Sequence, residues 1–281
     1  MATILVLGKG LFGARLAAGI EGAVHGAVDI TDRDAVRALL ARERPEAVIN
    51  AAGRTGTPNV DWCESHQTET YRANVIGALN VADACETVGA YLLHLGSGCV
   101  FYGPSPSPHG WREDDFANPS AFYSRTKYAA DLVLSRLAWV GVARLRMPVD
   151  HTPGPRNLIT KLVSYKQIID VQNSVTVVDD FVAVARQLIA QRAPGIFHVT
   201  NPGVMRHREL VDLYRELVDA EHACEFIDDG ALVERGLAVR ARSNCVLASS
   251  RLAQLGITMP PIDVALRDCM LRYAKALRDA R

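Results

Sequence analysis

Short, mostly apolar runs alternate with longer amphipathic segments through the first half of the chain. Runs of this kind are typical of strands that are buried on both faces of a parallel sheet. We predict strands at Thr3–Leu7, Ala47–Asn50, Tyr91–Leu95 and Val142–Arg146. We predict helices at Leu11–Ile20, Asp34–Arg42, Thr68–Val88 and Ser124–Leu137. This alternation predicts an α/β fold: an open, doubly wound parallel sheet with right-handed crossovers and helices on both faces.

A stretch that contains prolines and a glycine, Asp150–Arg156, interrupts the alternation. Beyond it, Ser174–Val178, a helix at Asp180–Gln191 and Gly195–Thr200 indicate a return to the main sheet, and the chain from Met205 is mostly helical and charged. We therefore expect a core over 1–150, an insertion over 151–175, a return to the core over 176–203 and a C-terminal region over 204–281. The insertion and the C-terminal region would form a small, mostly helical cap.

Composition and charge exclude several classes of protein. The 31 basic residues balance 31 acidic ones, so no overall field favours a nucleic acid or an anionic membrane. The six cysteines include no C-x-x-C pair, which indicates reduced thiols rather than a disulfide framework or a metal site. The N-terminus lacks a basic leader, and no run approaches the roughly 18 apolar residues of a membrane span. We expect a cytoplasmic protein.

A glycine-rich loop follows the first predicted strand and opens the first predicted helix. Its sequence, Gly8-Lys9-Gly10-Leu11-Phe12-Gly13, is a G-x-G-x-x-G motif. Gly8 allows a tight turn, Gly10 lets the backbone approach a pyrophosphate, and Gly13 allows the helix to pack closely on the strand. The helix N-terminus adds N–H groups and partial positive charge. The motif in this context predicts a dinucleotide site that includes Leu11 and Phe12.

The second strand of the sheet falls in a short region, Gly22–Asp32. The residue that distinguishes the two nicotinamide cofactors usually ends this strand. We expect Asp29 and Ile30 to border the adenine; a turn or helix-entry residue before Asp32 is the alternative for Asp29. The expected cofactor is NADP, with NAD as the alternative.

A second motif carries acid–base chemistry. Tyr123 and Lys127 form a Y-x-x-x-K pair, and residues four apart share one face of a helix. A nearby ammonium group favours the phenolate, so we expect Lys127 to lower the pKa of Tyr123 toward the working pH. Ser97 directly follows a predicted buried strand, and ligands of open α/β sheets bind outside the carboxyl ends of the strands. Ser97 is therefore the expected carbonyl-polarising hydroxyl.

These features resemble the extended short-chain dehydrogenase/reductases, which have a Rossmann-type fold. The resemblance rests on Gly8–Gly13, on Asn50–Gly53, on Ser97 and on the Tyr123/Lys127 pair. Asp29–Asp32 resembles the dTDP-4-dehydrorhamnose reductases, and a closer resemblance is to the nucleotide-rhamnose synthases, which are 3,5-epimerase/4-reductases. The similar blocks, in order along the chain, are Asn59–Ser65, Gly96–Phe101, Phe122–Lys127, Arg144–Pro148, Pro155–Lys161, Asn173–Asp179, Thr200–Val204 and Ala241–Asn244.

The resemblance implies a second pair of acid–base groups. The cysteine two residues after the catalytic Ser or Thr is an epimerisation acid/base in this family, and it corresponds to Cys99. Its lysine partner corresponds to Lys161. Inversion beside a keto group needs one group to remove a proton and another to return it on the opposite face. A small buried hydrophobic role is the alternative for Cys99, and a solvated surface charge is the alternative for Lys161.

Further site residues are implied in the same way. Asn157 and Arg242 would lie near the substrate and its diphosphate, which suits the forked guanidinium of an arginine. A solvated surface charge is again the alternative for Arg242. Together with the glycine loop and the Tyr123/Lys127 pair, the expected cofactor contacts are Ala51, Ala52, Gly53 and Pro148. Together with Asn157 and Arg242, the expected substrate contacts are Asn59 and Ser97.

The resulting expectation is an NAD(P)H-dependent 3,5-epimerase/4-reductase. Its substrate would be a nucleoside-diphospho-4-keto-6-deoxyglucose, and its product an activated deoxysugar such as dTDP- or UDP-rhamnose. One alternative is a monofunctional 4-ketoreductase in which Cys99 is only structural. The other is a non-catalytic protein that senses a dinucleotide, but such relatives typically lack the Tyr/Lys pair. The expected partner is the nucleotide sugar, and the resemblance allows a homodimer.

Overall fold

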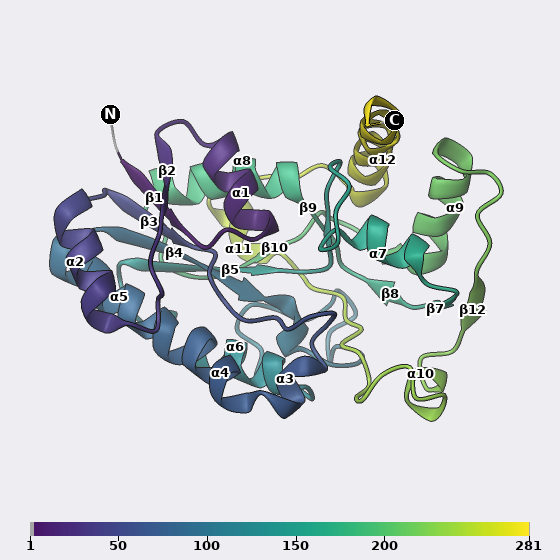
Figure 1. The fold of residues 1–281 in the computed structure, drawn as a ribbon, viewed down its shortest axis with the longest axis horizontal. Coiled ribbons are helices and arrows are strands. Elements are labelled where there is room, and N and C mark those ends of the chain that lie inside the picture. Colours follow the sequence, from purple (N-terminus) through teal and green to yellow (C-terminus); the bar gives the residue numbers. More distant parts are fainter. Residues whose placement is uncertain (1–2, 281) are drawn as a thin grey trace.

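The computed structural model describes residues 3–280, which form a Rossmann-type core with a smaller cap at one end (Figure 1). The core sheet has the strand order β10-β5-β4-β3-β1-β2, and every neighbouring pair is parallel. Its strands are β1 (Ile4–Leu7), β2 (Ala23–Gly26), β3 (Ala47–Asn50), β4 (Tyr91–Ser97), β5 (Val140–Leu145) and β10 (Gly195–Val199). The predicted doubly wound sheet is confirmed, and its short second strand lies at the edge.

Alternate strand residues face two separate hydrophobic layers. Ile4 and Val6 of β1 pack with residues of α1 and α8, whereas Leu5 and Leu7 pack with residues of α2, α5 and α6. Since successive side chains of a strand point to opposite faces, an uninterrupted apolar run is needed to serve both layers. The helices are α1 (Leu11–Gly19), α2 (Arg33–Glu43), α5 (Gly77–Val88), α6 (Phe122–Leu134) and α8 (Val178–Ala190).

The predicted helix Thr68–Val88 is divided in the structure. It consists of α4 (Gln67–Tyr71), a π-helical segment η1 (Arg72–Ile76) and α5. The segment η1 carries the buried Asn74, whose amide bonds the backbone N–H and C=O of Arg54 and the hydroxyl of Thr126. A wide turn of this kind is common near functional sites. Here it ties the loop after β3 to α6.

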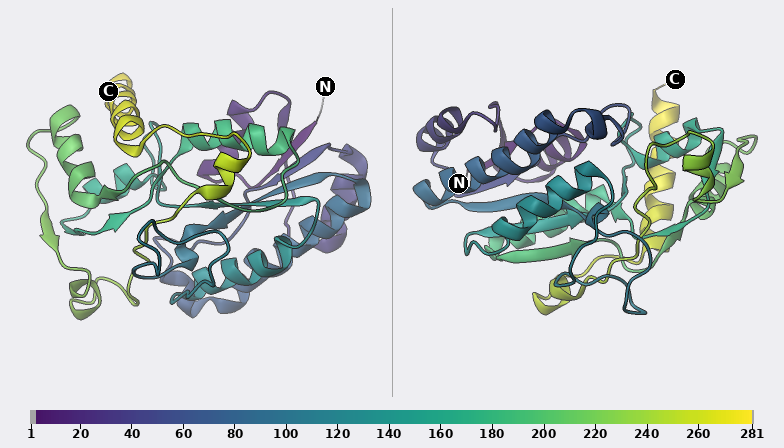
Figure 2. Two further views of the ribbon diagram at one scale, coloured as in Figure 1. Left: turned by 180° about the vertical axis from the view of Figure 1, so that it is seen from behind. Right: turned by 90° about the horizontal axis from the view of Figure 1, so that it is seen from below.

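The cap has its own hydrophobic cluster, built mainly on α7, α9 and α12. Figure 2 shows from two further sides that the cap lies at one end of the core. Its elements are β6 (Pro148–Val149), α7 (Leu158–Ser164), β7 (Gln167–Ile169), β8 (Gln172–Asn173), β9 (Thr176–Val177), β11 (Met205–Arg206), α9 (His207–Leu217), β12 (Glu225–Ile227), α10 (Ala231–Glu234) and α12 (Ile262–Asp279). No helix within residues 3–280 is long and apolar enough to span a bilayer.

Two further segments differ from the prediction. Ser174–Val178 was expected in the main sheet, but its strand β9 pairs with β6 in a separate two-stranded sheet. The hydroxyl of Thr176 donates to Val199 O and accepts from the N–H of Arg146, which holds β9 just beyond the ends of β5 and β10. In the C-terminal region, α11 (Ser250–Gln254) packs on β10, and Leu252 belongs to the core cluster. That region therefore contributes to the core as well as to the cap.

Candidate active site

Four of the five predicted catalytic residues lie together at the carboxyl end of β4, and the fifth, Lys161, lies apart from them on α7 (Leu158–Ser164) of the cap. Ser97 is the last residue of that strand, and its Oγ accepts a hydrogen bond of 3.2 Å from the N–H of Cys99. This bond closes a short 3-10 turn over Gly98–Val100. The turn places the Ser97 hydroxyl and the Cys99 thiol on neighbouring positions beside the N-terminal turn of α6, where Tyr123 lies.

Tyr123 is partly exposed and neighbours both Ser97 and Cys99. Burial raises the pKa of the Tyr123 phenol, Cys99 raises it further, and a hydrogen bond to Ser97 opposes the shift. The expected lowering of the Tyr123 pKa by Lys127 is therefore wrong. The physical reason is that burial disfavours the phenolate more than the neighbouring groups favour it.

Lys127 is more deeply buried than Tyr123, and its ammonium group contacts residues of β4. Its Nζ donates to Leu95 O at 2.7 Å and lies 3.0 Å from Nε2 of His94. Burial lowers the pKa of Lys127 to about 8, and Asp131 opposes the shift. His94 in turn lies 3.2 Å from Nδ2 of Asn50, whose Oδ1 accepts from the N–H of Ala52. A buried polar chain thus joins Lys127 to the predicted cofactor loop after β3.

His94 was missed in the sequence, although it gives a visible signal: a histidine in the middle of the apolar run Tyr91–Leu95. Burial, with the Lys127 charge, lowers the pKa of His94 well below its ordinary value. The buried ion pair between Arg144 and Asp131, at 2.8 Å, was also missed. His94 contacts Lys127 directly, and the Arg144–Asp131 pair joins β5 to α6.

The glycine loop has the geometry that a pyrophosphate requires. Gly8 has a φ of +95°, and a Cβ on Gly13 would lie 1.9 Å from Gly8 O, so neither position accepts a side chain. Gly10 is the N-cap of α1 and places no capping side chain over its first N–H groups. A Cβ at Gly10 would meet Nη1 of Arg156 at 2.9 Å. Arg156 comes from the cap and places a guanidinium beside the loop, a contact that the motif alone does not indicate.

The other predicted cofactor residues lie after β1, β2 and β3 and at the start of β6. Phe12 packs edge-on against Phe181, and a Cβ at Gly8 would meet the backbone of Ala51 and Ala52. Ile30 is buried against Gly77. Asp29 is exposed and accepts two hydrogen bonds of 2.9 Å from Thr31, which lower its pKa. Its turn geometry matches the alternative interpretation. Leu11 begins α1, Gly53 follows Ala52 in the loop after β3, and Pro148 begins β6.

The predicted substrate residues make contacts within the protein. Both amide atoms of the buried Asn157 are engaged: Oδ1 caps α7, and Nδ2 donates to Asp150 O and Thr152 O. Asn59 Oδ1 accepts from the N–H of Asp61. Arg242 donates twice to the Asp61 carboxylate, each time at 2.8 Å. Asn59 and Arg242 are thus brought together around Asp61, and the expectation of Arg242 as a freely solvated charge does not hold.

Lys161 lies on α7 in the cap and is partly buried. Burial, together with the nearby Arg156, lowers the pKa of Lys161. Cys99 is also only partly buried, and its Sγ accepts a hydrogen bond of 2.9 Å from Nη1 of Arg146. Cys99 is therefore not a simple hydrophobic filler. Arg146 lies inside the Arg144–Pro148 block, but no pattern in the sequence assigns it a role.

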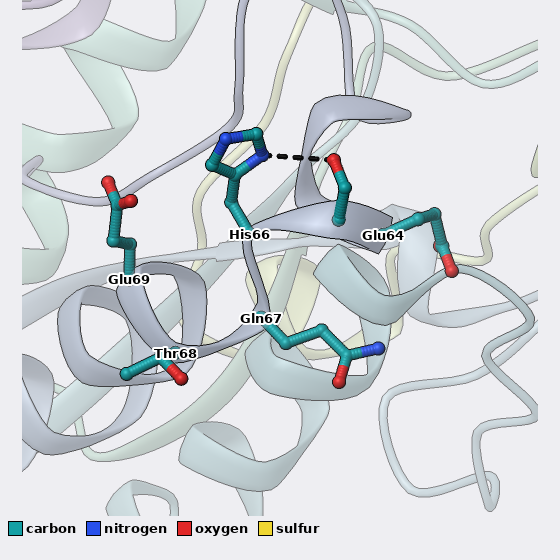
Figure 3. Close-up of a pocket in the computed structure, with 6 residues that line it drawn as sticks. Glu64, His66, Gln67, Thr68 and Glu69 are labelled. Carbon is teal, nitrogen blue, oxygen red and sulfur yellow. Dashed lines mark hydrogen bonds between the residues drawn. The ribbon is translucent and has the colours of Figure 1, made fainter.

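A surface hollow of about 480 Å³ lies near this region, lined by Glu64–Glu69 around α3 (Trp62–Ser65) and the start of α4 (Figure 3). His66 bonds the hydroxyl of Ser65 there. Glu64 Oε1 accepts from the N–H of Phe122, next to Tyr123. None of the predicted site residues lines the hollow, so it is separate from the catalytic group.

Comparisons with known proteins agree with this geometry. A bifunctional dTDP-4-dehydrorhamnose 3,5-epimerase/reductase of Arabidopsis thaliana is 38% identical over 201 residues, which cover 69% of this chain and 67% of that protein. A trifunctional UDP-glucose 4,6-dehydratase/3,5-epimerase/reductase of the same plant is 34% identical over 89% of this chain, but the match spans only 37% of that longer protein.

Among solved structures, the L780 UDP-rhamnose synthase of Acanthamoeba polyphaga mimivirus has a TM-score of 0.89 at 26% identity. That match covers 97% of this chain and all of the viral one. The family model described as the RmlD substrate binding domain matches residues 2–274. The chain therefore belongs to the RmlD substrate binding domain family.

Proposed function

We propose that this chain is an NAD(P)H-dependent 3,5-epimerase/4-reductase of a nucleoside-diphospho-4-keto-6-deoxyglucose, and that it forms an activated deoxysugar such as dTDP- or UDP-rhamnose. The observation that carries the proposal is the meeting of Ser97, Cys99 and Tyr123 at the end of β4. Ser97 and Cys99 are joined by the turn after β4, so the proposed reductase residues and the proposed epimerase thiol would act on one bound sugar. The names of the Arabidopsis and mimivirus relatives support it.

In the reduction, the 4-keto oxygen would lie against Ser97 and Tyr123. C4 would receive the hydride that a bound nicotinamide cofactor would supply. Tyr123 gives its proton to O4, and its raised pKa keeps that proton in place until charge develops on the oxygen. The Ser97 hydroxyl polarises the carbonyl from the neighbouring position. Lys127 would hold the cofactor ribose and return a proton to Tyr123, a role that suits its lowered pKa.

The cofactor site fits the residues that are present. The bare glycine backbone at Gly8, Gly10 and Gly13 leaves room for a pyrophosphate at the N-terminus of α1. Arg156 would add a bidentate donor. The remaining contacts proposed for NADP, or alternatively for NAD, are Leu11, Phe12, Asp29, Ile30, Ala51, Ala52, Gly53 and Pro148.

In the epimerisation, Cys99 and Lys161 would act on opposite faces of the sugar ring. The 4-keto group acidifies the protons at C3 and C5, so each inversion needs one proton removed and one returned. The partly buried positions of both groups suit proton exchange with a bound sugar. Asn59 and Arg242, held around Asp61, and Asn157, which shapes the turn before α7, would position the nucleotide diphosphate and the sugar.

Oxidation of the reduced cofactor, followed at 340 nm, tests the reductase half directly. The protein is mixed with UDP- or dTDP-4-keto-6-deoxyglucose and either NADPH or NADH. We expect turnover that requires the keto sugar and is lost in Tyr123→Phe. Cys99→Ser is measured beside it, and Cys224→Ser, at a partly buried thiol packed against the cap cluster, is its matched control. No turnover with either sugar nucleotide by a protein that binds the cofactor would overturn the proposal.

A further inference from the structure

Arg146 is a buried arginine with an unusual set of partners. Arg146 lies between β5 and β6, and only 3% of the residue is exposed. The guanidinium donates to Sγ of Cys99 at 2.9 Å, to Oδ1 of Asn173 and to the backbone oxygen of Ser243. Nε has no partner. Two of the three acceptors are neutral oxygens, and the third is a thiol group.

No carboxylate within residues 3–280 forms an ion pair with Arg146. The contrast with Arg144 is direct, because Arg144 is equally buried and pairs with Asp131 at 2.8 Å. A buried guanidinium remains charged, and an uncompensated buried charge is strongly unfavourable. The side chain of Arg146 therefore needs an anion nearby. Cys99 and Cys245 are the acidic groups that contact the Arg146 guanidinium, so they are the groups that can supply the charge.

The hydrogen bonds distinguish the two thiols. Cys245 is buried, and its Sγ donates to Gly98 O at 3.5 Å, which requires the protonated form. Burial also raises the pKa of Cys245. Cys99 is partly exposed and only accepts, from Arg146. Cys99 is therefore the thiol whose hydrogen bonds leave it free to carry a negative charge against Arg146.

We infer that Arg146 is a positioning residue that holds Cys99 as a thiolate, ready to remove a proton from the bound keto sugar. The inference rests on the proposed epimerase function. The thiolate would take the proton of the C–H bond and become a thiol, and the electron pair would pass into the enolate of the 4-keto sugar. The Lys161 ammonium would then give a proton to the same carbon from the opposite face. Exchange with water would restore both groups.

Other titratable groups near this pair do not replace Arg146. Tyr123 faces Cys99 from α6 and is neutral below its raised pKa. Cys245 faces Arg146 and stays protonated, as argued above. His207, at the start of α9, lies near Arg146, and burial lowers the pKa of His207 to about 4. Above pH 6, Arg146 is therefore the charged group in contact with Cys99.

The test measures the charge of Cys99 without using catalysis. Iodoacetamide reacts with thiolates, so its rate at each cysteine, measured by peptide mass spectrometry from pH 6 to 9, reports ionisation. We expect Cys99 of the wild type to react nearly as fast at pH 6.5 as at pH 8.5. Arg146→Gln should slow the reaction at pH 6.5 at least tenfold, and Arg146→Lys should restore part of it. The Arg215–Cys224 contact, at 3.8 Å on the cap, offers the matched control, because Arg215→Met should leave Cys99 unaffected.

Two further measurements distinguish a failure of the Arg146–Cys99 inference from a failure of the proposed epimerase function. Thiolate absorbance at 240 nm should be larger in the wild type than in Cys99→Ser at pH 7, a comparison that does not require an Arg146 variant to fold. In deuterated water, Arg146→Gln should lower the rate of deuterium incorporation into the sugar at least tenfold more than it lowers the rate of reduction of the keto group. An unchanged alkylation profile in a folded Arg146→Gln protein, or no absorbance difference at pH 7, would overturn the inference. If alkylation behaves as expected but the wild type takes up no label, the proposed epimerase function fails and the Arg146–Cys99 coupling stands.

Discussion

Nζ of Lys127 lies 3.0 Å from Nε2 of His94, and both side chains are buried under the ends of β3 and β4. Burial lowers the pKa of Lys127 from its ordinary 10.5 to about 8. Below pH 8 the folded and unfolded chains both hold the proton, so the folded protein bears the full cost of the buried ammonium, about 3 kcal/mol at roughly 1.4 kcal/mol per pKa unit. This cost decreases between pH 8 and 10.5, because in that range the unfolded chain binds more protons than the folded chain, in which Lys127 becomes neutral.

The corresponding prediction concerns stability. Relative to Lys127→Met, the wild type should gain free energy of unfolding as the pH rises from 8 to 10.5. Urea denaturation at pH 7 and pH 10 measures this difference. Lys275→Met, at an exposed position on α12, is the control and should show no such trend. A Lys127→Met difference that is the same at both pH values would contradict the buried ammonium.

The glycine loop predicts two different outcomes for two similar substitutions. At Gly10 a new side chain meets only the flexible end of Arg156, whereas at Gly13 it meets the backbone of Gly8. Gly10→Val should therefore fold normally but bind NADPH at least tenfold more weakly. Gly13→Val should lower the thermal midpoint as well. Cofactor fluorescence titration and thermal melts distinguish the two, and full NADPH affinity in Gly10→Val would remove the loop from the cofactor site.

Tyr123→Phe should reduce turnover by about 10²- to 10⁴-fold, the range typical of a lost general acid. The phenol forms a hydrogen bond with Ser97, and the ring itself is retained in the variant. Steady-state rates with a 4-keto sugar nucleotide measure the effect. Tyr128→Phe, one turn further along α6, controls for changes in helix packing. Near-normal turnover by Tyr123→Phe would exclude this residue as the acid.

The bidentate pair of Arg242 and Asp61 joins the C-terminal region to the loop before α3. Both side chains are partly buried, so the two should be coupled by about 1 kcal/mol, the upper part of the range for exposed pairs. A double-mutant cycle of Arg242→Met and Asp61→Asn on the free energy of unfolding measures this coupling. Additive effects would show that the pair contributes nothing to docking the two segments.

Much of the core was predictable because its determinants are local. The apolar runs and the glycine loop depend on neighbouring residues, and they place β1, β3, β4 and α1 within a few residues. The Ser97 and Tyr123/Lys127 positions follow from the same local rules. Ser174–Val178 was misplaced because a short apolar run suits any sheet, and here the hydroxyl of Thr176 directs it to β6.

The supporting side chains could not be predicted because their partners are remote in the sequence. His94 meets Lys127 across 33 positions, and Arg146 meets Cys99 across 47. The residues that neighbour an arginine or a lysine in the sequence do not indicate whether its charge will be buried. They also do not indicate which thiol it will contact. The Tyr123 pKa failed as a prediction for the same reason, since burial by distant segments outweighs the spacing of two residues on one helix.

One measurement tests the proposed epimerase/reductase most directly. The protein is incubated with UDP- or dTDP-4-keto-6-deoxyglucose and NADPH in deuterated water, and the product is examined by mass spectrometry and NMR. The proposal predicts one deuteron at C3 and one at C5, unlabelled hydrogen at C4, and loss of both deuterons in Cys99→Ser and Lys161→Met. A reduced product of the wild type without deuterium at C3 and C5 would contradict it and leave a plain 4-ketoreductase.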